Sequence, residues 1–167
     1  TEANPRHRDL LDVSVLYPGG AIASDAMPWT NPDGSVYDGE DWPLPEGTSS
    51  HPRSSGTFTR FLRQYVRERG MLPLIDGLAK CTLIPAQVLE ASTPAMRTKG
   101  RLKVGADADI VVFDYDTLTD RAEFKAMNRA SEGMRHVFVN GEAVIADGAL
   151  VRAARPGRPV RRPVKGA

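Results

Sequence analysis

The chain has 167 residues, of which 41% are hydrophobic and 26% are charged, and its formal net charge is +1. These values are ordinary for one globular domain, and the near-neutral charge excludes a strongly basic nucleic-acid binder. A single cysteine, Cys81, excludes a disulfide framework and a cysteine zinc cluster. No apolar run reaches the ~18 residues of a membrane span, and no secretory signal is visible. We therefore expect a cytoplasmic protein without a nucleic-acid or membrane partner.

The first quarter of the chain contains one irregular helical pattern and one short apolar segment. Residues 4–17 carry the helical pattern, which ends at Pro18-Gly19-Gly20. Residues 21–24 are small and apolar, which predicts a short buried strand ending in Asp25. Residues 26–57 are then rich in Pro, Gly, Ser and Asp, and loops of that length are usually functional or disordered. We expect its two tryptophans, Trp29 and Trp42, to line a pocket or to anchor the loop.

The clearest helix is predicted over residues 57–70. Its apolar residues recur three and four positions apart. Thr57 or Thr59 is the expected N-cap, and Gly70 suits the left-handed C-terminal end. Two shorter helices are expected from residues 73 and 85, and Gly77 in the first of them indicates close packing or an early stop.

From residue 100 onwards the pattern becomes that of an antiparallel sheet. Apolar, β-rich runs cover residues 109–114, 136–140, 142–146 and 149–151. Asn140-Gly141 is a strong signal for a two-residue hairpin turn, and Asp147-Gly148 is a second turn signal. We therefore predict helices first and a sheet second.

The charges are unevenly distributed along the chain. Residues 33–46 contain five acidic and no basic side chains, whereas the chain after Asp147 contains basic and no acidic ones. We expect a solvated acidic loop and a flexible basic tail over residues 155–167. A nucleic-acid-binding arm is the less favoured interpretation, because no aromatic residue is interleaved for base stacking.

Two residues stand out as candidates for chemistry. Asp25 follows the short apolar segment, and barrels place catalytic groups at the carboxyl ends of their strands, although spacing alone favours an aspartate that caps a turn. Arg53 is able to clamp a substrate carboxylate through two hydrogen bonds, or to pair with the acidic loop.

The remaining reactive residues fit structural roles. The three histidines, His7, His51 and His136, are scattered without metal-ligand spacing, so no metal cage is expected within this sequence. Cys81 lies on the apolar side of a predicted helix and is expected to be a buried small hydrophobe. His136 begins a predicted strand and is expected to be structural.

Five segments of the chain carry recognisable motifs. Three of them are residues 82–89 (TLIPAQVL), 99–114 (KGRLKVGADADIVVFD) and 139–144 (VNGEAV), and these resemble the amidohydrolase superfamily. The other two are residues 23–25 (ASD) and 51–58 (HPRSSGTF), and these resemble more narrowly its D-aminoacylase (N-acyl-D-amino-acid deacylase) group. The resemblance that these segments carry extends over nearly the whole chain.

The resemblance implies an α+β fragment: the last strand and helices of a (β/α)₈ TIM barrel followed by part of an antiparallel β-sandwich. A whole barrel needs about 250 residues, so most of it is expected to be missing. Residues 1–98, with the long loop 26–57, would be the C-terminal part of the barrel. Residues 99–154 would be the sandwich subdomain, and residues 155–167 a basic tail. The missing N-terminal barrel portion of the same protein is then an expected partner, and the fragment alone is expected to be inactive.

The resemblance also implies roles for four residues. Asp25 would contact the metal and act as the general base on the hydrolytic water. Arg53 would hold the substrate's α-carboxylate, while His51 and Ser54 would shape the surrounding loop. The cofactor would be Zn²⁺ in the full-length enzyme, with most of its ligands absent from this sequence. Ala26 stands where a glycine is common in the group, which suggests a different specificity for the acyl group or side chain.

Two alternatives stay open at this point, together with the question of assembly. A cyclic amide or imide would be the substrate of a dihydroorotase-like or hydantoinase-like enzyme. A β-sandwich module used only for assembly would need no catalytic residue at all. Because an isolated strand and exposed apolar helix faces favour association, we expect either a homo-oligomer or pairing of the strand at residues 21–24 with another part of the protein.

Overall fold

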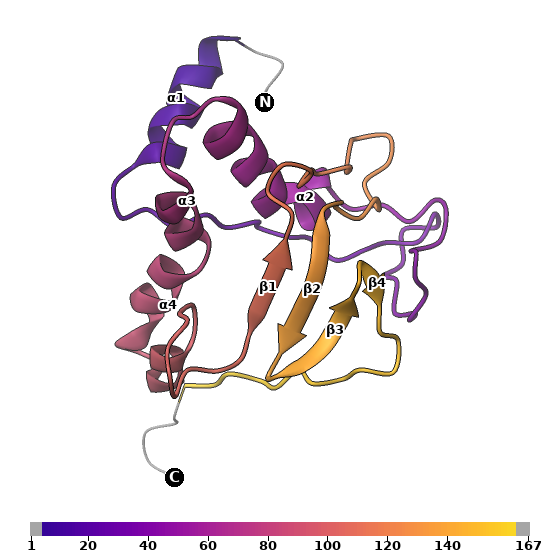
Figure 1. Cartoon of the computed structure of the whole chain (residues 1–167). Coiled ribbons are helices and arrows are strands. Elements are labelled where there is room, and N and C mark those ends of the chain that lie inside the picture. The colour runs from indigo at the N-terminus through magenta and orange to yellow at the C-terminus, as the bar shows by residue number, and fades with distance from the viewer. Residues whose placement is uncertain (1–4, 163–167) are drawn as a thin grey trace.

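The computed structural model describes residues 5–162, which form a group of helices beside one sheet (Figure 1). The chain begins with α1 (Pro5–Leu16) and, after a long loop, continues into α2 (Pro52–Phe61). The next elements are a π-helix, η1 (Leu62–Glu68), then α3 (Leu74–Cys81), α4 (Leu83–Glu90) and a 3₁₀ helix, η2 (Pro94–Thr98). The strands follow in order: β1 (Ile110–Phe113), β2 (Met134–Val139), β3 (Glu142–Ala146) and β4 (Ala149–Leu150). The predicted order of helices before strands is therefore confirmed.

The sheet is an antiparallel meander in the order β1-β2-β3-β4. Asn140 and Gly141 join β2 to β3 with φ values of 49° and 82°, and Asp147 and Gly148 join β3 to β4 with φ values of 50° and 79°. Two successive positive φ angles are the signature of the type I′ turn, which matches the twist of paired strands. Both turns predicted from the sequence are confirmed, and the described residues form an α+β fold.

The helix expected over residues 57–70 begins earlier than predicted. Pro52 occupies its first turn, where its fixed φ fits and no N–H is needed. The backbone N–H of Arg53 donates to Nδ1 of His51 over 3.1 Å, so the cap is His51, and the prediction of Thr57 or Thr59 is wrong. From Leu62 the helix widens into η1, and Gly70 with φ of 57° follows its end as expected.

The core lies where η1 packs against α3 and the segment after β1. Phe61, Leu62, Tyr65 and Val66 are buried together with Leu118. A Cβ placed on Gly77 of α3 would lie 2.6 Å from Cγ2 of Val66, so the glycine is there because the two helices approach closely. Cys81 packs on the same cluster as a partly buried hydrophobe, as expected.

Residues 21–24 do not form the predicted short buried strand. They have no regular secondary structure, Ala21 and Ala23 are exposed, and the part of the chain that the structure describes places no strand beside them. The N–H of Ile22 donates to the carbonyl of Lys80 over 2.9 Å, and this is the segment's backbone hydrogen bond to another element. A strand needs a neighbouring strand for its ladder, and apolar composition alone cannot supply one.

The long loop between α1 and α2 is held by contacts within itself and by contacts with the segment after β4. Isolated bridges join Thr30 to Val36 and to Ser49, so part of the loop folds on itself. Its acidic tip meets the basic segment after β4: Nη2 of Arg155 lies 3.0 Å from Glu40, and Arg152 donates to the carbonyl of Trp42. Figure 1 shows the loop beyond the β4 side of the sheet, opposite α3 and α4. Residues 163–167 of the predicted tail lie outside the described residues, and no helix within residues 5–162 is long and apolar enough to cross a membrane.

Candidate active site

The structure brings Asp25 and Arg53 together from positions 28 residues apart. Nη2 of Arg53 lies 3.1 Å from Oδ2 of Asp25, and Nε of Arg53 donates to the Asp25 carbonyl over 2.7 Å. Asp25 has a φ of 48°, a left-handed conformation that aspartate tolerates better than most residues. Its side chain is 86% exposed, so the carboxylate is open to solvent. The Arg53 guanidinium thus contacts both the main-chain carbonyl and the side-chain carboxylate of Asp25.

The other two predicted site residues fix the start of α2. His51 uses Nδ1 to cap the helix, and its ring packs edge-on against Phe124 with centroids 5.1 Å apart. The Ser54 hydroxyl accepts a hydrogen bond from the N–H of Met27 over 3.2 Å and lies 2.9 Å from the hydroxyl of Ser50. Ser54, the residue next to Arg53, therefore ties the chain just after Asp25 to the first turn of α2.

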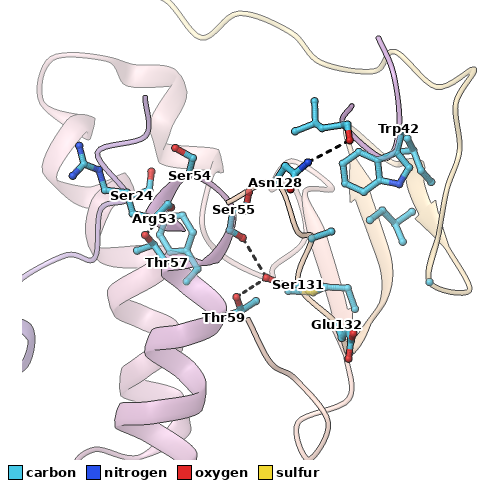
Figure 2. Close-up of a pocket in the computed structure, with 18 of the residues that line it drawn as sticks. Ser24, Trp42, Arg53, Ser54, Ser55, Thr57, Thr59, Asn128, Ser131 and Glu132 are labelled. Carbon is cyan, nitrogen blue, oxygen red and sulfur yellow. Dashed lines mark hydrogen bonds between the residues drawn. The ribbon is translucent and has the colours of Figure 1, made fainter. Parts of the chain in front are cut away.

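A cavity of about 870 Å³ opens between α2, the long loop and the sheet (Figure 2). Both tryptophans of the loop line it, which confirms the expectation that they line a pocket. Figure 2 shows Arg53 and Ser24 on one side of α2 and Asn128 and Glu132 on the other. Arg53 and Ser24 line this space, whereas Asp25, which Arg53 contacts, is not among the residues that line it. Its lining includes Ser24, Trp29, Trp42, Ser54, Phe58 and Met134.

Several small polar side chains that line the cavity form hydrogen bonds between α2, the long loop and the segment before β2, and sequence reasoning missed them. The Thr59 and Ser131 hydroxyls are 2.7 Å apart, and the Ser131 hydroxyl also donates to the carbonyl of Ser55 over 3.2 Å. Asn128 donates to the carbonyls of Leu44 and Pro45 over 3.4 and 3.3 Å, which ties the loop to the segment between β1 and β2. Ser55 and Thr59 are four residues apart on one helix face, which was a usable signal, but nothing in the sequence pointed to their partners.

The buried carboxylate of Asp120 anchors α2 and η1 to the segment that follows β1. Its oxygens accept from Nε of Arg60 over 2.7 Å and from Nε of Arg63 over 2.9 Å, while only 3% of its side chain is exposed. Burial alone would raise the pKa of Asp120, but the hydrogen bonds from both guanidinium groups outweigh it, so the pKa lies below its usual range. This carboxylate fixes the helix that carries Arg53 and Ser54.

The described residues do not build a zinc site by themselves. Within residues 5–162 no three histidine, cysteine or acidic side chains lie close enough to share a metal ion. Asp25 is a carboxylate of the kind zinc accepts, but its partner here is the Arg53 cation. His136 lies on β2, where its Nδ1 accepts a hydrogen bond from the N–H of Asp147 over 3.4 Å, and its structural role stays a prediction. Burial raises the pKa of the Cys81 thiol to about 12, which makes it a poor thiolate ligand or nucleophile.

The sequence profile of the amidohydrolase family matches residues 2–145, which is most of the chain. The chain belongs to the amidohydrolase family. Two amidohydrolase relatives come from Alcaligenes xylosoxydans xylosoxydans. An N-acyl-D-glutamate deacylase is 47% identical over 119 residues, and a D-aminoacylase is 32% identical over 154 residues. These matches cover 71% and 82% of this chain but 23% and 30% of the two relatives, so the chain spans less than a third of their length.

Solved amidohydrolase structures agree with this assignment. The N-acyl-D-glutamate deacylase from Bordetella bronchiseptica, complexed with zinc and a phosphonate inhibitor that mimics the tetrahedral intermediate, matches with a TM-score of 0.56 and 41% identity. That match covers 67% of this chain and 22% of the other. A D-aminoacylase crystal structure matches with a TM-score of 0.55 and 35% identity, over 61% of this chain and 20% of the other.

Proposed function

We propose that this chain is the C-terminal region of a metal-dependent amidohydrolase that hydrolyses the amide bond of N-acyl-D-amino acids. The observation that carries the proposal is the Asp25–Arg53 pair, whose arginine lines the cavity. It sets a solvent-open carboxylate beside a cation suited to an α-carboxylate. The relatives named as N-acyl-D-glutamate deacylase and D-aminoacylase support the substrate class.

The two side chains divide the chemistry between them. The Asp25 carboxylate acts as a general base when it accepts a proton from the hydrolytic water, and as a general acid when it donates that proton to the leaving amine. The Arg53 guanidinium binds the substrate's α-carboxylate by two parallel hydrogen bonds, a geometry that an ammonium group does not offer. Because Arg53 already contacts Asp25, a carboxylate bound there lies next to the base.

His51 and Ser54 take positioning roles in this proposal. The hydrogen bond from the Arg53 N–H to Nδ1 of His51 fixes the first turn of α2, and this turn carries Arg53. The bond between Ser54 and Met27 holds the chain that leaves Asp25 and Ala26. We also propose that Ala26, in place of a glycine, narrows the choice of acyl group or side chain accepted next to Asp25.

The architecture that we propose for the whole enzyme follows from the resemblance to the amidohydrolase superfamily. Residues 1–98 would complete a (β/α)₈ barrel, residues 99–154 would form part of a β-sandwich, and residues 155–167 would be a basic tail. Ile75 and Val88 on α3 and α4 are 72% and 68% exposed, and we propose that the remaining barrel covers them. The proposed metal is zinc, with which the Bordetella bronchiseptica relative is complexed, and Asp25 would be one of its contacts. The roles of Asp25 and Arg53 stated above do not depend on it.

The proposal is tested by kinetics of the full protein that carries this sequence, with N-acetyl-D-glutamate as the first substrate. We expect Asp25→Asn to lower kcat by about 100-fold or more, as loss of a general base does. We expect Arg53→Lys to raise KM with a smaller change in kcat, because the clamp acts on the bound substrate. Activity on the L-enantiomer is the matched control. Equal rates on both enantiomers, or opening of a cyclic imide without any deacylation, would refute the assignment.

A further inference from the structure

We propose that Lys80 is a positioning residue that holds the segment leading to Asp25, an inference that rests on the proposed function. Lys80 lies in the last turn of α3 and is only 6% exposed. Its Nζ donates to the carbonyl of Tyr17 over 2.6 Å and to the carbonyl of Gly20 over 3.0 Å. A buried ammonium group needs such partners, and here both partners are main-chain atoms of the segment before Asp25.

The same residue also holds the segment through its backbone. The carbonyl of Lys80 accepts the N–H of Ile22 over 2.9 Å, so its side chain and main chain contact the segment at successive points. Among the described residues, the hydrogen bonds that reach residues 17–25 from other elements come from Lys80 and Arg53. One anchor therefore stands on each side of Ala23 and Ser24.

The irregular backbone makes this anchor necessary. A strand inside a sheet is located by its ladder, but residues 21–24 have no strand beside them in the described part of the chain. Gly20 fits the anchor closely, since a Cβ there would lie 3.1 Å from the Tyr17 carbonyl oxygen and 3.8 Å from Nζ of Lys80. Asp25 is three residues beyond Ile22 and is itself held by Arg53, so loss of the Lys80 anchor leaves the segment held on one side only and lets the carboxylate shift. A misplacement of about 1 Å costs a rate factor of about 100 in oriented catalysis.

The test compares Lys80→Met with the wild type in the full protein. Methionine fills the space of the lysine stem but donates no hydrogen bond. We expect kcat for N-acetyl-D-glutamate to fall by about 10- to 100-fold and KM to stay within about twofold, because the lysine acts on the base and not on the bound carboxylate. Lys80→Arg, which keeps the donors, is expected to restore most of kcat. Lys103→Met removes an exposed lysine as the matched control and is expected to leave both parameters unchanged.

A double variant separates positioning from general damage. In the Asp25→Asn background, Lys80→Met is expected to cause no further loss of kcat, since the base it positions is already gone. Hydrogen exchange supplies a readout that does not need activity. The Ile22 amide is expected to exchange about tenfold faster, or more, in Lys80→Met. If Lys80→Met is unfolded by circular dichroism, Lys80→Gln replaces it with the same expectations, because the amide keeps a polar end but loses the reach.

The two proposals fail in distinguishable ways. Wild-type kcat in Lys80→Met beside an impaired Asp25→Asn would overturn the positioning role alone. The same holds for a full additional loss in the double variant, or for unchanged exchange at Ile22. Wild-type kcat in Asp25→Asn would instead overturn the proposed function, and with it any role of Lys80 towards that carboxylate.

Discussion

Replacement of Asp120 by asparagine removes the charge on which α2 and η1 are anchored, without changing the size of the side chain. The carboxylate is almost fully buried, whereas its partners Arg60 and Arg63 keep 33% and 21% of their side chains exposed. The variant therefore leaves two guanidinium groups beside a neutral amide. Both can still reach water at their outer edges, and this limits the damage.

The magnitude follows from these exposures. Breaking a buried ion pair by removing one partner costs about 3–5 kcal/mol when the remaining charge is fully enclosed. Because both arginines reach solvent and the amide oxygen still accepts one hydrogen bond, we expect Asp120→Asn to cost about 2–3 kcal/mol of the free energy of unfolding. The matched control is Glu132→Gln, which breaks the pair between Arg121 and Glu132 whose side chains are 52% and 59% exposed. An exposed pair is worth about 0–1 kcal/mol.

Urea unfolding followed by circular dichroism measures both variants. We expect the midpoint of Asp120→Asn to fall clearly below that of Glu132→Gln with an unchanged m-value. The pH dependence adds a second check. The pKa of Asp120 is lowered in the folded protein, so its contribution is fully present above about pH 4 and is lost as the pH falls through the folded-state pKa. The difference between wild type and Asp120→Asn should therefore shrink at low pH. Equal losses of unfolding free energy in the two variants would refute the reasoning. The desolvation of the Asp120 carboxylate would then have cancelled its attraction to the two arginines.

Three further predictions concern packing, reactivity and acid stability. Gly77→Ala should destabilise the protein by about 1–2 kcal/mol in urea unfolding, since the clash with Val66 exceeds the gain in helix propensity; a stabilised variant would contradict the close packing. Cys81 should react with a thiol reagent at about pH 8 far more slowly in the folded than in the urea-unfolded protein, since burial raises its pKa to about 12. The hydrogen bond from Arg69 lowers the pKa of Asp12 to about 2 against the opposing effect of desolvation. The stability that this lowered pKa contributes is present above about pH 4 and is lost as the pH falls towards 2. Arg69→Gln should therefore raise the pKa of Asp12 in an NMR titration and reduce the fall in the free energy of unfolding between pH 4 and pH 2.

The sequence was most informative where a local rule decides the structure. Both hairpin turns follow from the pairs Asn140-Gly141 and Asp147-Gly148. Each pair acts only on the two strands that it joins. The helices before residue 91 follow from apolar spacing, although the start of α2 was placed five residues late because histidine is an uncommon N-cap. The tryptophans of the long loop were informative as well, since large aromatic side chains in a polar segment indicated a pocket.

Features that need distant partners escaped prediction. The anchor on Asp120 joins residues 57 and 60 positions apart, and no pattern in the sequence links them. Residues 21–24 have the composition of a buried strand, but a strand exists only beside another strand. The sequence indicated different roles for Arg53 and Asp25 but gave no sign that the two side chains form an ion pair, as they do in the structure. The catalytic roles of both residues remain predictions for the kinetic experiments.

The meander of β2, β3 and β4 has a consequence for the order of folding. Its strands lie within residues 134–150 and are joined by tight turns, so their contacts are close in sequence and cost little loop entropy to form. The contacts of Asp120 with α2 and η1 span a far longer stretch of chain. We therefore expect the meander to be largely formed in the folding transition state and the helices to dock onto it later. A weakened turn at Gly141 would then slow folding, whereas Asp120→Asn would mainly speed unfolding.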